Sequence, residues 1–205
     1  MKYNNIFILC TGRSGSSSFI KACSHITNYT NGHESLASKF GASRLAYPIH
    51  HIEADNRLSW FLGALGNKFD DNTTLYIHLI REKEATVKSF NSRWNLPGSI
   101  IKAFSEGILK IPYQKLTTPD RELVCVDYYD TVNTNIAYFI KNKPNTLTLP
   151  FEDIKDGFKT FWDNIDAQGD VNNALAEFNV LHNKCTKNQN TSIKYRLKLF
   201  LMKFR

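Results

Sequence analysis

The hydrophobic positions of the chain fall into short continuous runs separated by amphipathic stretches. Continuous runs bounded by polar residues are typical of strands buried on both faces, and they occur at 6–10 and, rich in β-forming residues, at 74–80. The segment 48–54 is a weaker strand candidate, and 146–154 predicts a last strand and turn. Apolar residues at helical spacing predict helices at 18–26, from Asp55 or Asn56 onward, at 82–94 and at 123–140. Because strands alternate with helices, the pattern predicts an α/β protein with three layers around a central parallel sheet.

The length of the chain suits one such domain. We place it at residues 1–190, since 205 residues with 42% hydrophobic content are enough to bury a core. Residues 191–205 combine basic and apolar residues and predict an amphipathic C-terminal helix, which either packs on the domain or lies on an anionic membrane surface. No window approaches the roughly 20 apolar residues that span a bilayer, and the first apolar run is too short for a signal peptide.

Charge and cysteine content narrow the range of partners. The net charge of +7 favours an anionic partner, which leaves nucleic acid, an acidic membrane surface and a multiply charged nucleotide open. The four cysteines are scattered, with no C-x-x-C pair and no histidine spacing of a zinc site. A reducing cytoplasm fits them best, although an even number also permits two disulfides.

A glycine-containing loop follows the first strand directly and reads TGRSGSSSF. An ATP-binding loop of the Walker type needs G-x-x-x-x-G-K-[ST], whereas here Gly12 and Gly15 stand too close together and no lysine follows. Arg13 nevertheless offers a fork of donors, and Gly15 lets the backbone approach a ligand closely. Hydroxyls surround the start of the helix at Ser14, Ser16, Ser17 and Ser18. The loop therefore predicts an anion site at a helix N-terminus and disfavours a kinase or an ATPase.

The segment RSGSS at 13–17 resembles the phosphosulfate-binding loop of the sulfotransferases that use 3'-phosphoadenosine 5'-phosphosulfate (PAPS). The resemblance implies a fold like that of the P-loop nucleoside triphosphatases and a PAPS donor bound without a metal. It also implies that Arg13 and the hydroxyls around Gly15 bind the 5'-phosphosulfate.

A second segment, IHLIREKEATVKSF at 77–90, resembles the family at a second motif. In the family, an arginine after a later strand and a serine in the following helix hold the 3'-phosphate, which implies that role for Arg81 and Ser89. Each residue alone is equally consistent with an ordinary surface position, but the two motifs occur in the family's order.

The segment TNGHESLASKF at 30–40 offers a general base. Branches of the family that sulfate sugars or tyrosines use a glutamate at a comparable distance after the loop, which implies Glu34 as the base, with His33 as the alternative. Arg13 would then stabilise the leaving phosphate. A simple helix cap at 34–35 accounts for the same residues without catalysis.

The segment HIEADNRLSWFLG at 51–63 places Glu53, Asp55 and Arg57 at a strand-to-helix turn, where α/β folds bind ligands. These residues either orient the acceptor or the loop, or form a capped helix with a surface ion pair.

The sequence therefore predicts a PAPS-dependent sulfotransferase that acts on a hydroxyl of a carbohydrate, lipid or small metabolite. We expect specificity from the loops 36–47 and 96–119, and Lys184 and Lys187 are candidates for closing the nucleotide site. A kinase-like phosphotransferase and a non-catalytic nucleic-acid-binding module are the alternatives. The second lacks any recognisable nucleic-acid-binding motif, so we expect no nucleic-acid partner.

Overall fold

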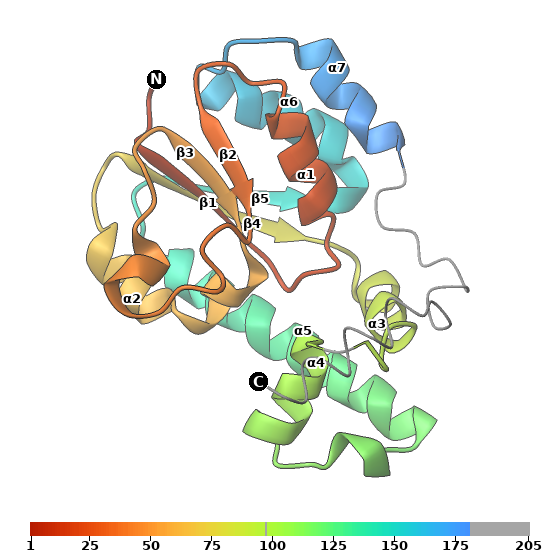
Figure 1. Ribbon diagram of the computed structural model, residues 1–205. Helices are drawn as coiled ribbons and strands as arrows, with labels where there is room; N and C mark the ends of the chain where they lie inside the picture. The colour runs from red at the N-terminus through yellow and green to blue at the C-terminus, as the bar shows by residue number, and fades with distance from the viewer. Residues whose placement is uncertain (97, 181–205) are drawn as a thin grey trace, which may run out of the picture.

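The computed structural model describes residues 1–96 and 98–180 and shows a central sheet with helices on both faces (Figure 1). All neighbouring strands are parallel, and their order across the sheet is β2-β3-β1-β4-β5. The strands are β1 (Asn5–Leu9), β2 (Thr30–His33), β3 (His51–Ala54), β4 (Thr74–Ile80) and β5 (Thr146–Pro150). The predicted three-layer α/β architecture is thereby confirmed.

The helices divide between the two faces of the sheet. They are α1 (Ser16–Cys23), α2 (Leu62–Lys68), α3 (Lys83–Asn91), α4 (Ile100–Ala103), α5 (Thr118–Ile140), α6 (Ile154–Asn164) and α7 (Val171–Ala176). Helices α1, α6 and α7 cover one face, whereas α2 and α5 lie on the side of the other, with α3 and α4 packed against α5 (Figure 1).

Two hydrophobic cores result from the alternation of side chains along the strands. In β1, Ile6 and Ile8 face the core beneath α1 and α6, while Phe7 and Leu9 face the core beneath α5. Every residue of β1 is buried, as expected for the central strand of a parallel sheet. This burial explains why an apolar run of only five residues marks the strand so clearly.

The structure differs from the prediction at two places. Strand β2 was missed, because Thr30–His33 contains no aliphatic residue and forms a partly exposed edge of the sheet. The single helix expected after Asp55 is instead a 3-10 turn, Asn56–Trp60, followed by α2. Phe61 lies at the break between them and is 42% exposed, so it does not share the buried face of Leu58 and Leu65.

Some expectations fall outside the described residues. The domain boundary at 190, the helix expected at 191–205, and Lys184 and Lys187 cannot be compared with the structure. Within residues 1–96 and 98–180, no helix is long and apolar enough to cross a membrane. The three cysteines of that part of the chain, Cys10, Cys23 and Cys125, are buried and free.

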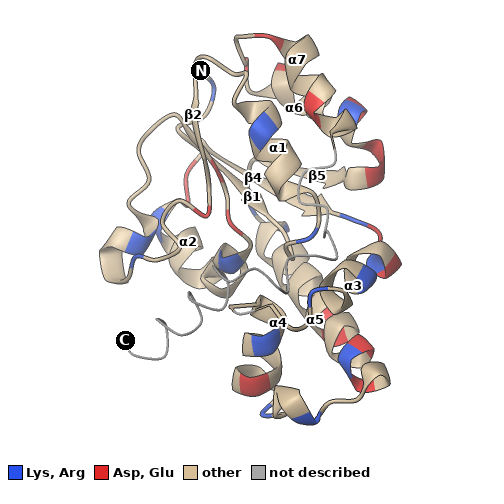
Figure 2. Cartoon of the chain, turned by 45° about the vertical axis from the view of Figure 1, so that its right-hand side comes forward, with Lys and Arg blue, Asp and Glu red and all other residues tan. Residues whose placement is uncertain are grey.

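The net charge is distributed unevenly along the sequence. Residues 181–205 contain seven of the 26 basic residues and no acidic one, which leaves 19 basic residues against the 19 acidic residues of the chain. In the view of Figure 2, acidic and basic residues are interspersed over α3 and α5. The described domain is therefore neutral overall, and the charge that favoured an anionic partner resides in the C-terminal 25 residues.

Candidate active site at the carboxyl ends of the strands

The loop between β1 and α1 adopts a conformation that its glycines make possible. Gly12, Arg13 and Gly15 have φ values of 79°, 59° and 93°, so three of four consecutive residues are left-handed. Gly15 forms the N-cap of α1 with no side-chain cap, and the first turn of the helix contains no acidic residue. The helix therefore begins with backbone N–H groups and hydroxyls but no negative charge, a donor set that fits an anionic group.

The two motifs identified in the sequence lie together in space. The Arg13 side chain donates a hydrogen bond from Nε to Ser89 Oγ at 3.0 Å, although 76 residues separate the two. Arg81, directly after β4, donates from Nη1 to the carbonyl oxygen of Arg13 at 3.2 Å. The loop, the end of β4 and the last turn of α3 thus form one basic site.

Two tyrosines that the sequence analysis did not identify, one buried and one partly buried, support this site. The Tyr128 hydroxyl of α5 donates to the carbonyl oxygen of Thr11 at 2.8 Å, and burial raises the pKa of that hydroxyl. The neighbouring Tyr129 hydroxyl donates to the carbonyl oxygen of Arg81 at 2.8 Å. Both anchors come from adjacent residues of one helix, so α5 fixes the loop and the second motif relative to each other.

The serines of the loop occupy two environments. Ser16 and Ser17 lie with their Oγ atoms 3.3 Å and 3.4 Å from Nε2 of His33, which ends β2. Ser14, Ser16 and Ser18 are buried, whereas Ser17 is partly exposed. His33 is thus positioned against the loop hydroxyls, and of the four serines only Ser16 and Ser17 line the neighbouring cavity.

Glu34 follows β2 and forms an ion pair across the site. Its carboxylate Oε2 lies 2.7 Å from Nη1 of Arg57, and about one third of each side chain is exposed. Residues 35–38 form turns and no helix, so the helix-cap explanation for Glu34 does not apply. Glu34 has a φ of 54°, which is uncommon for a residue other than glycine.

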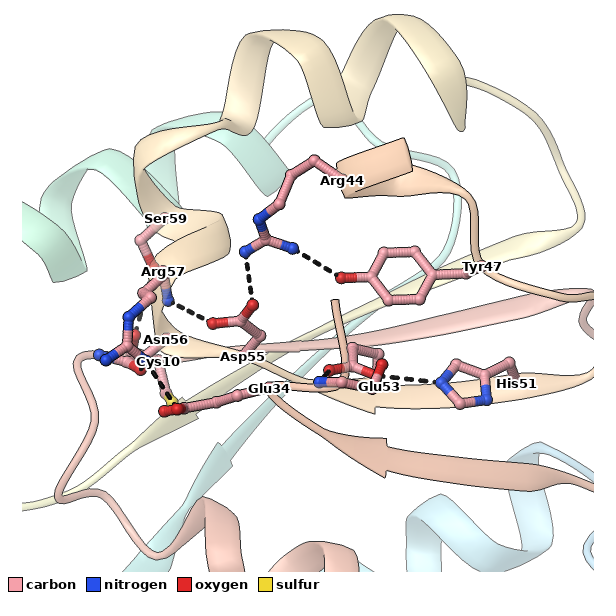
Figure 3. A network of polar contacts seen from close by, with 11 residues as sticks. Cys10, Glu34, Arg44, Tyr47, His51, Glu53, Asp55, Asn56, Arg57 and Ser59 are labelled. Carbon is pink, nitrogen blue, oxygen red and sulfur yellow. Dashed lines mark hydrogen bonds and ion pairs between the residues drawn. The ribbon is translucent and has the colours of Figure 1, made fainter. Parts of the chain in front are cut away.

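Two carboxylates of the β3 segment are fully buried behind this ion pair (Figure 3). Asp55 accepts from the backbone N–H of Arg57 at 2.8 Å and from Nη2 of Arg44 at 2.5 Å, so it caps the 3-10 turn from within the protein. Burial raises the pKa of Glu53, but hydrogen bonds from His51 and Ser35 outweigh burial and hold that pKa below its ordinary value. The expected surface ion pair at this turn is therefore mostly a buried network.

A cavity of about 270 Å³ opens between the loop, the ion pair and the segment after α3. Its lining includes Gly12, Arg13, Ser16, Ser17, His33, Glu34, Asn56, Arg57, Phe90, Arg93, Leu96, Gly98, Ser99 and Ile100. Arg93 was not predicted, although it follows Ser89 by four residues and helical spacing would have placed both on one side. The cavity brings together the candidate base, the loop and part of the 96–119 segment.

Two solved structures are similar to this chain in fold. The crystal structure of mouse sulfotransferase SULT7A1 complexed with PAP is similar to this chain with a TM-score of 0.59 and 12% identity, over 97% of this chain and 82% of that one. The chain has the sulfotransferase fold. The sulfotransferase domain from the curacin biosynthetic pathway gives a TM-score of 0.54 and 13% identity, over 95% and 82% of the two chains. No family model matches the sequence, and no curated protein is significantly similar to it.

Proposed function

We propose that this protein is a sulfotransferase that moves a sulfonate group from PAPS to a hydroxyl acceptor. The observation that carries the proposal is the contact of Arg13 with both Ser89 and Arg81, at the start of α1, in a chain with the sulfotransferase fold. One of the similar structures is complexed with PAP, the product that remains when PAPS loses its sulfonate.

The positions of residues in the site suggest which of them would bind each phosphate of PAPS. The N–H groups that begin α1, with Ser16 and Ser17, would hold the 5'-phosphosulfate, since they present donors and no acid. Arg81 and Ser89 would hold the 3'-phosphate. Arg13 donates a hydrogen bond to Ser89 and accepts one from Arg81 at its carbonyl oxygen, so its guanidinium would stabilise the charge of either phosphate.

The reaction requires in-line attack and removal of one proton. The acceptor oxygen forms a bond to sulfur as the bond from sulfur to the bridging phosphate oxygen breaks, and PAP leaves with that oxygen. Glu34 would take the proton of the acceptor hydroxyl, because its carboxylate is partly exposed and lines the cavity beside the loop. Arg57 holds that carboxylate in place by the ion pair at 2.7 Å.

His33 serves a different purpose in this proposal. Its Nε2 contacts the hydroxyls of Ser16 and Ser17 and would orient them toward the sulfonate. His33 would therefore position the donor, whereas Glu34 would take the proton. Acceptor contacts would come from Leu96, Ser99 and Ile100, since these border the same cavity, whereas no residue of the loop 36–47 lines it. A carbohydrate, a lipid and a small metabolite are the acceptor classes that we propose to test.

The direct test is transfer of label from ³⁵S-PAPS to a panel of sugars, lipids and small hydroxyl compounds. We expect label in at least one acceptor and a loss of about 10²-fold or more in kcat for Glu34→Gln, which is the usual contribution of a general base. Lys159→Ala, which removes an exposed charge from α6 that does not line the cavity, serves as the control and retains activity. Folded wild-type protein that transfers no label and binds no PAP would contradict the proposal, and equal loss in His33→Ala but none in Glu34→Gln would reassign the base.

A further inference from the structure

The backbone at Glu34 is held from both sides by groups of the β3 segment. The N–H of Glu34 donates to the carbonyl oxygen of Ala54 at 2.9 Å. The N–H of the next residue, Ser35, donates to Oε1 of Glu53 at 2.8 Å, and the Ser35 hydroxyl donates to Oε2 of Glu53 at 2.6 Å. Three hydrogen bonds thus fix two consecutive residues at the point where β2 ends.

This fixation accounts for the conformation of Glu34. A residue with a β-carbon adopts a left-handed backbone at a cost of roughly 1–2 kcal/mol, and such conformations persist only where the surroundings determine them. At Glu34 the surroundings are the Ser35 bonds to Glu53 and the bond to Ala54. Without the Glu53 carboxylate, the chain after β2 would lose two of the three bonds that impose this conformation.

Glu53 is itself held by a line of hydrogen bonds across the two edge strands. His51 Nε2 lies 3.0 Å from Glu53 Oε2, and Thr30 Oγ1 lies 2.9 Å from His51 Nδ1. A β-carbon at Gly32 would lie 2.7 Å from Glu53 Oε2, so glycine leaves the room that the carboxylate occupies. The carboxylate is therefore buried, accepts hydrogen bonds at both oxygens, and does not line the cavity.

We propose that Glu53 is a positioning residue for the transfer reaction, acting through Ser35 on the left-handed backbone of Glu34. The proposal rests on the function proposed above, because it concerns the residue assigned as base. Glu53 does not line the cavity. By fixing the backbone at Glu34, it sets the direction in which the Glu34 side chain points toward Arg57. A displacement of a catalytic group by about 1 Å can lower the rate by about 10²-fold, so this hold has a measurable effect on kcat.

The first test compares Glu53→Gln and Ser35→Ala with Ser38→Ala, a matched change at an exposed serine of the same turn. Glutamine keeps the size of Glu53 but offers a single acceptor oxygen. Ser35→Ala removes the hydrogen bond from the Ser35 hydroxyl to Glu53 and, because Ser35 is exposed, creates no buried cavity. With an acceptor found in the transfer assay, we expect kcat to fall about 10-fold or more in the first two variants. We expect the acceptor KM and the PAP-induced thermal shift to stay within twofold, and Ser38→Ala to match the wild type.

A positioning role and a general structural role predict different rates once the Glu34 carboxylate has been removed. In single-turnover assays on the Glu34→Gln background, Glu53→Gln should lower the residual rate by less than twofold. A further drop as large as in the wild-type background would show that Glu53 acts on the whole site and would overturn the proposal. A kcat for Glu53→Gln within twofold of the wild type would overturn it as well.

The third measurement does not depend on activity, so it separates failure of this proposal from failure of the proposed function. Amide hydrogen exchange at Glu34 and Ser35 should be about 10-fold faster in Ser35→Ala and Glu53→Gln, with β1 unchanged. Wild-type protein without transfer or PAP binding would refute the proposed function alone. Unchanged exchange at these two amides in both variants would refute the role of Glu53 whatever the activity.

Discussion

Replacement of Gly15 by alanine tests the left-handed conformation of the loop between β1 and α1. Gly15 has a φ of 93°, where a β-carbon is strained by roughly 1–2 kcal/mol. A β-carbon built there would lie 2.0 Å from Cε2 of Phe151, so the ring that also stacks against Arg81 would have to move. Overpacking of this kind costs about 1–3 kcal/mol.

The two costs add because they have separate causes. Together they predict a loss of roughly 2–5 kcal/mol, which for a chain of this size lowers Tm by about 4–20 °C. We also expect the variant to lose the thermal shift that PAP produces, since the N–H groups at the start of α1 would move with Gly15.

The matched control is the same substitution at Gly63. This residue is exposed in α2, and nothing lies within 4 Å of a β-carbon built on it. Alanine there should leave the free energy of unfolding unchanged or raise it by the roughly 0.4–1 kcal/mol that a helix gains when glycine is replaced. Thermal and urea unfolding measure both variants. A Gly15→Ala protein with the Tm and PAP response of the wild type would refute the description of the loop.

Three further predictions concern buried polar groups. Tyr128→Phe removes the hydroxyl that donates a hydrogen bond to the Thr11 carbonyl oxygen. We therefore expect the free energy of unfolding in urea to fall by about 1–3 kcal/mol and PAP binding to weaken. Unchanged values for both would contradict the role of Tyr128 in anchoring the loop. Asp55→Ala leaves the Arg44 guanidinium buried without its carboxylate and should cost about 3–5 kcal/mol, whereas a loss below about 1 kcal/mol would refute the buried pair. The depressed pKa of Glu53 stabilises the fold above its ordinary value of 4.5, and this contribution is lost as the pH falls through the lower folded-state pKa. The difference in free energy of unfolding between the wild type and Glu53→Gln should therefore be largest near pH 6 and decrease below about pH 5. A difference that stays constant from about pH 6 to pH 3 would contradict the lowered pKa of Glu53.

The buried centre of the fold could be predicted from the sequence because burial leaves a local pattern. The run at 74–80 is the β4 strand to the residue, since almost every position in it is buried. The edge strand Thr30–His33 leaves no such pattern, because hydrogen bonds to β3 define it and its side chains are partly exposed. Helix α5 begins at Thr118, five residues before the predicted start, because a capping box between Thr117 and Asp120 fixes its first turn.

The candidate site could be predicted as a set of residues but not as a set of contacts. The loop and the pair at 81 and 89 were found because both occur in short segments with the family's spacing. The ion pair between Glu34 and Arg57 joins two segments that carry no sign of each other in sequence. The same holds for Tyr128, which reads as one more core residue of a helix until its hydroxyl is seen to contact Thr11.

Thermal unfolding with and without PAP tests the central claim most directly. A ligand present at 100 times its Kd stabilises the folded state by about 2.7 kcal/mol, so we expect Tm of the wild type and of Lys159→Ala to rise by about 5–11 °C. Arg13→Ala and Arg81→Ala should fold and lose most of that rise, because each removes a guanidinium from the site where the two motifs meet. A folded wild type whose Tm does not respond to PAP, or an equal response in all four proteins, would contradict the assignment of this site to a PAPS donor.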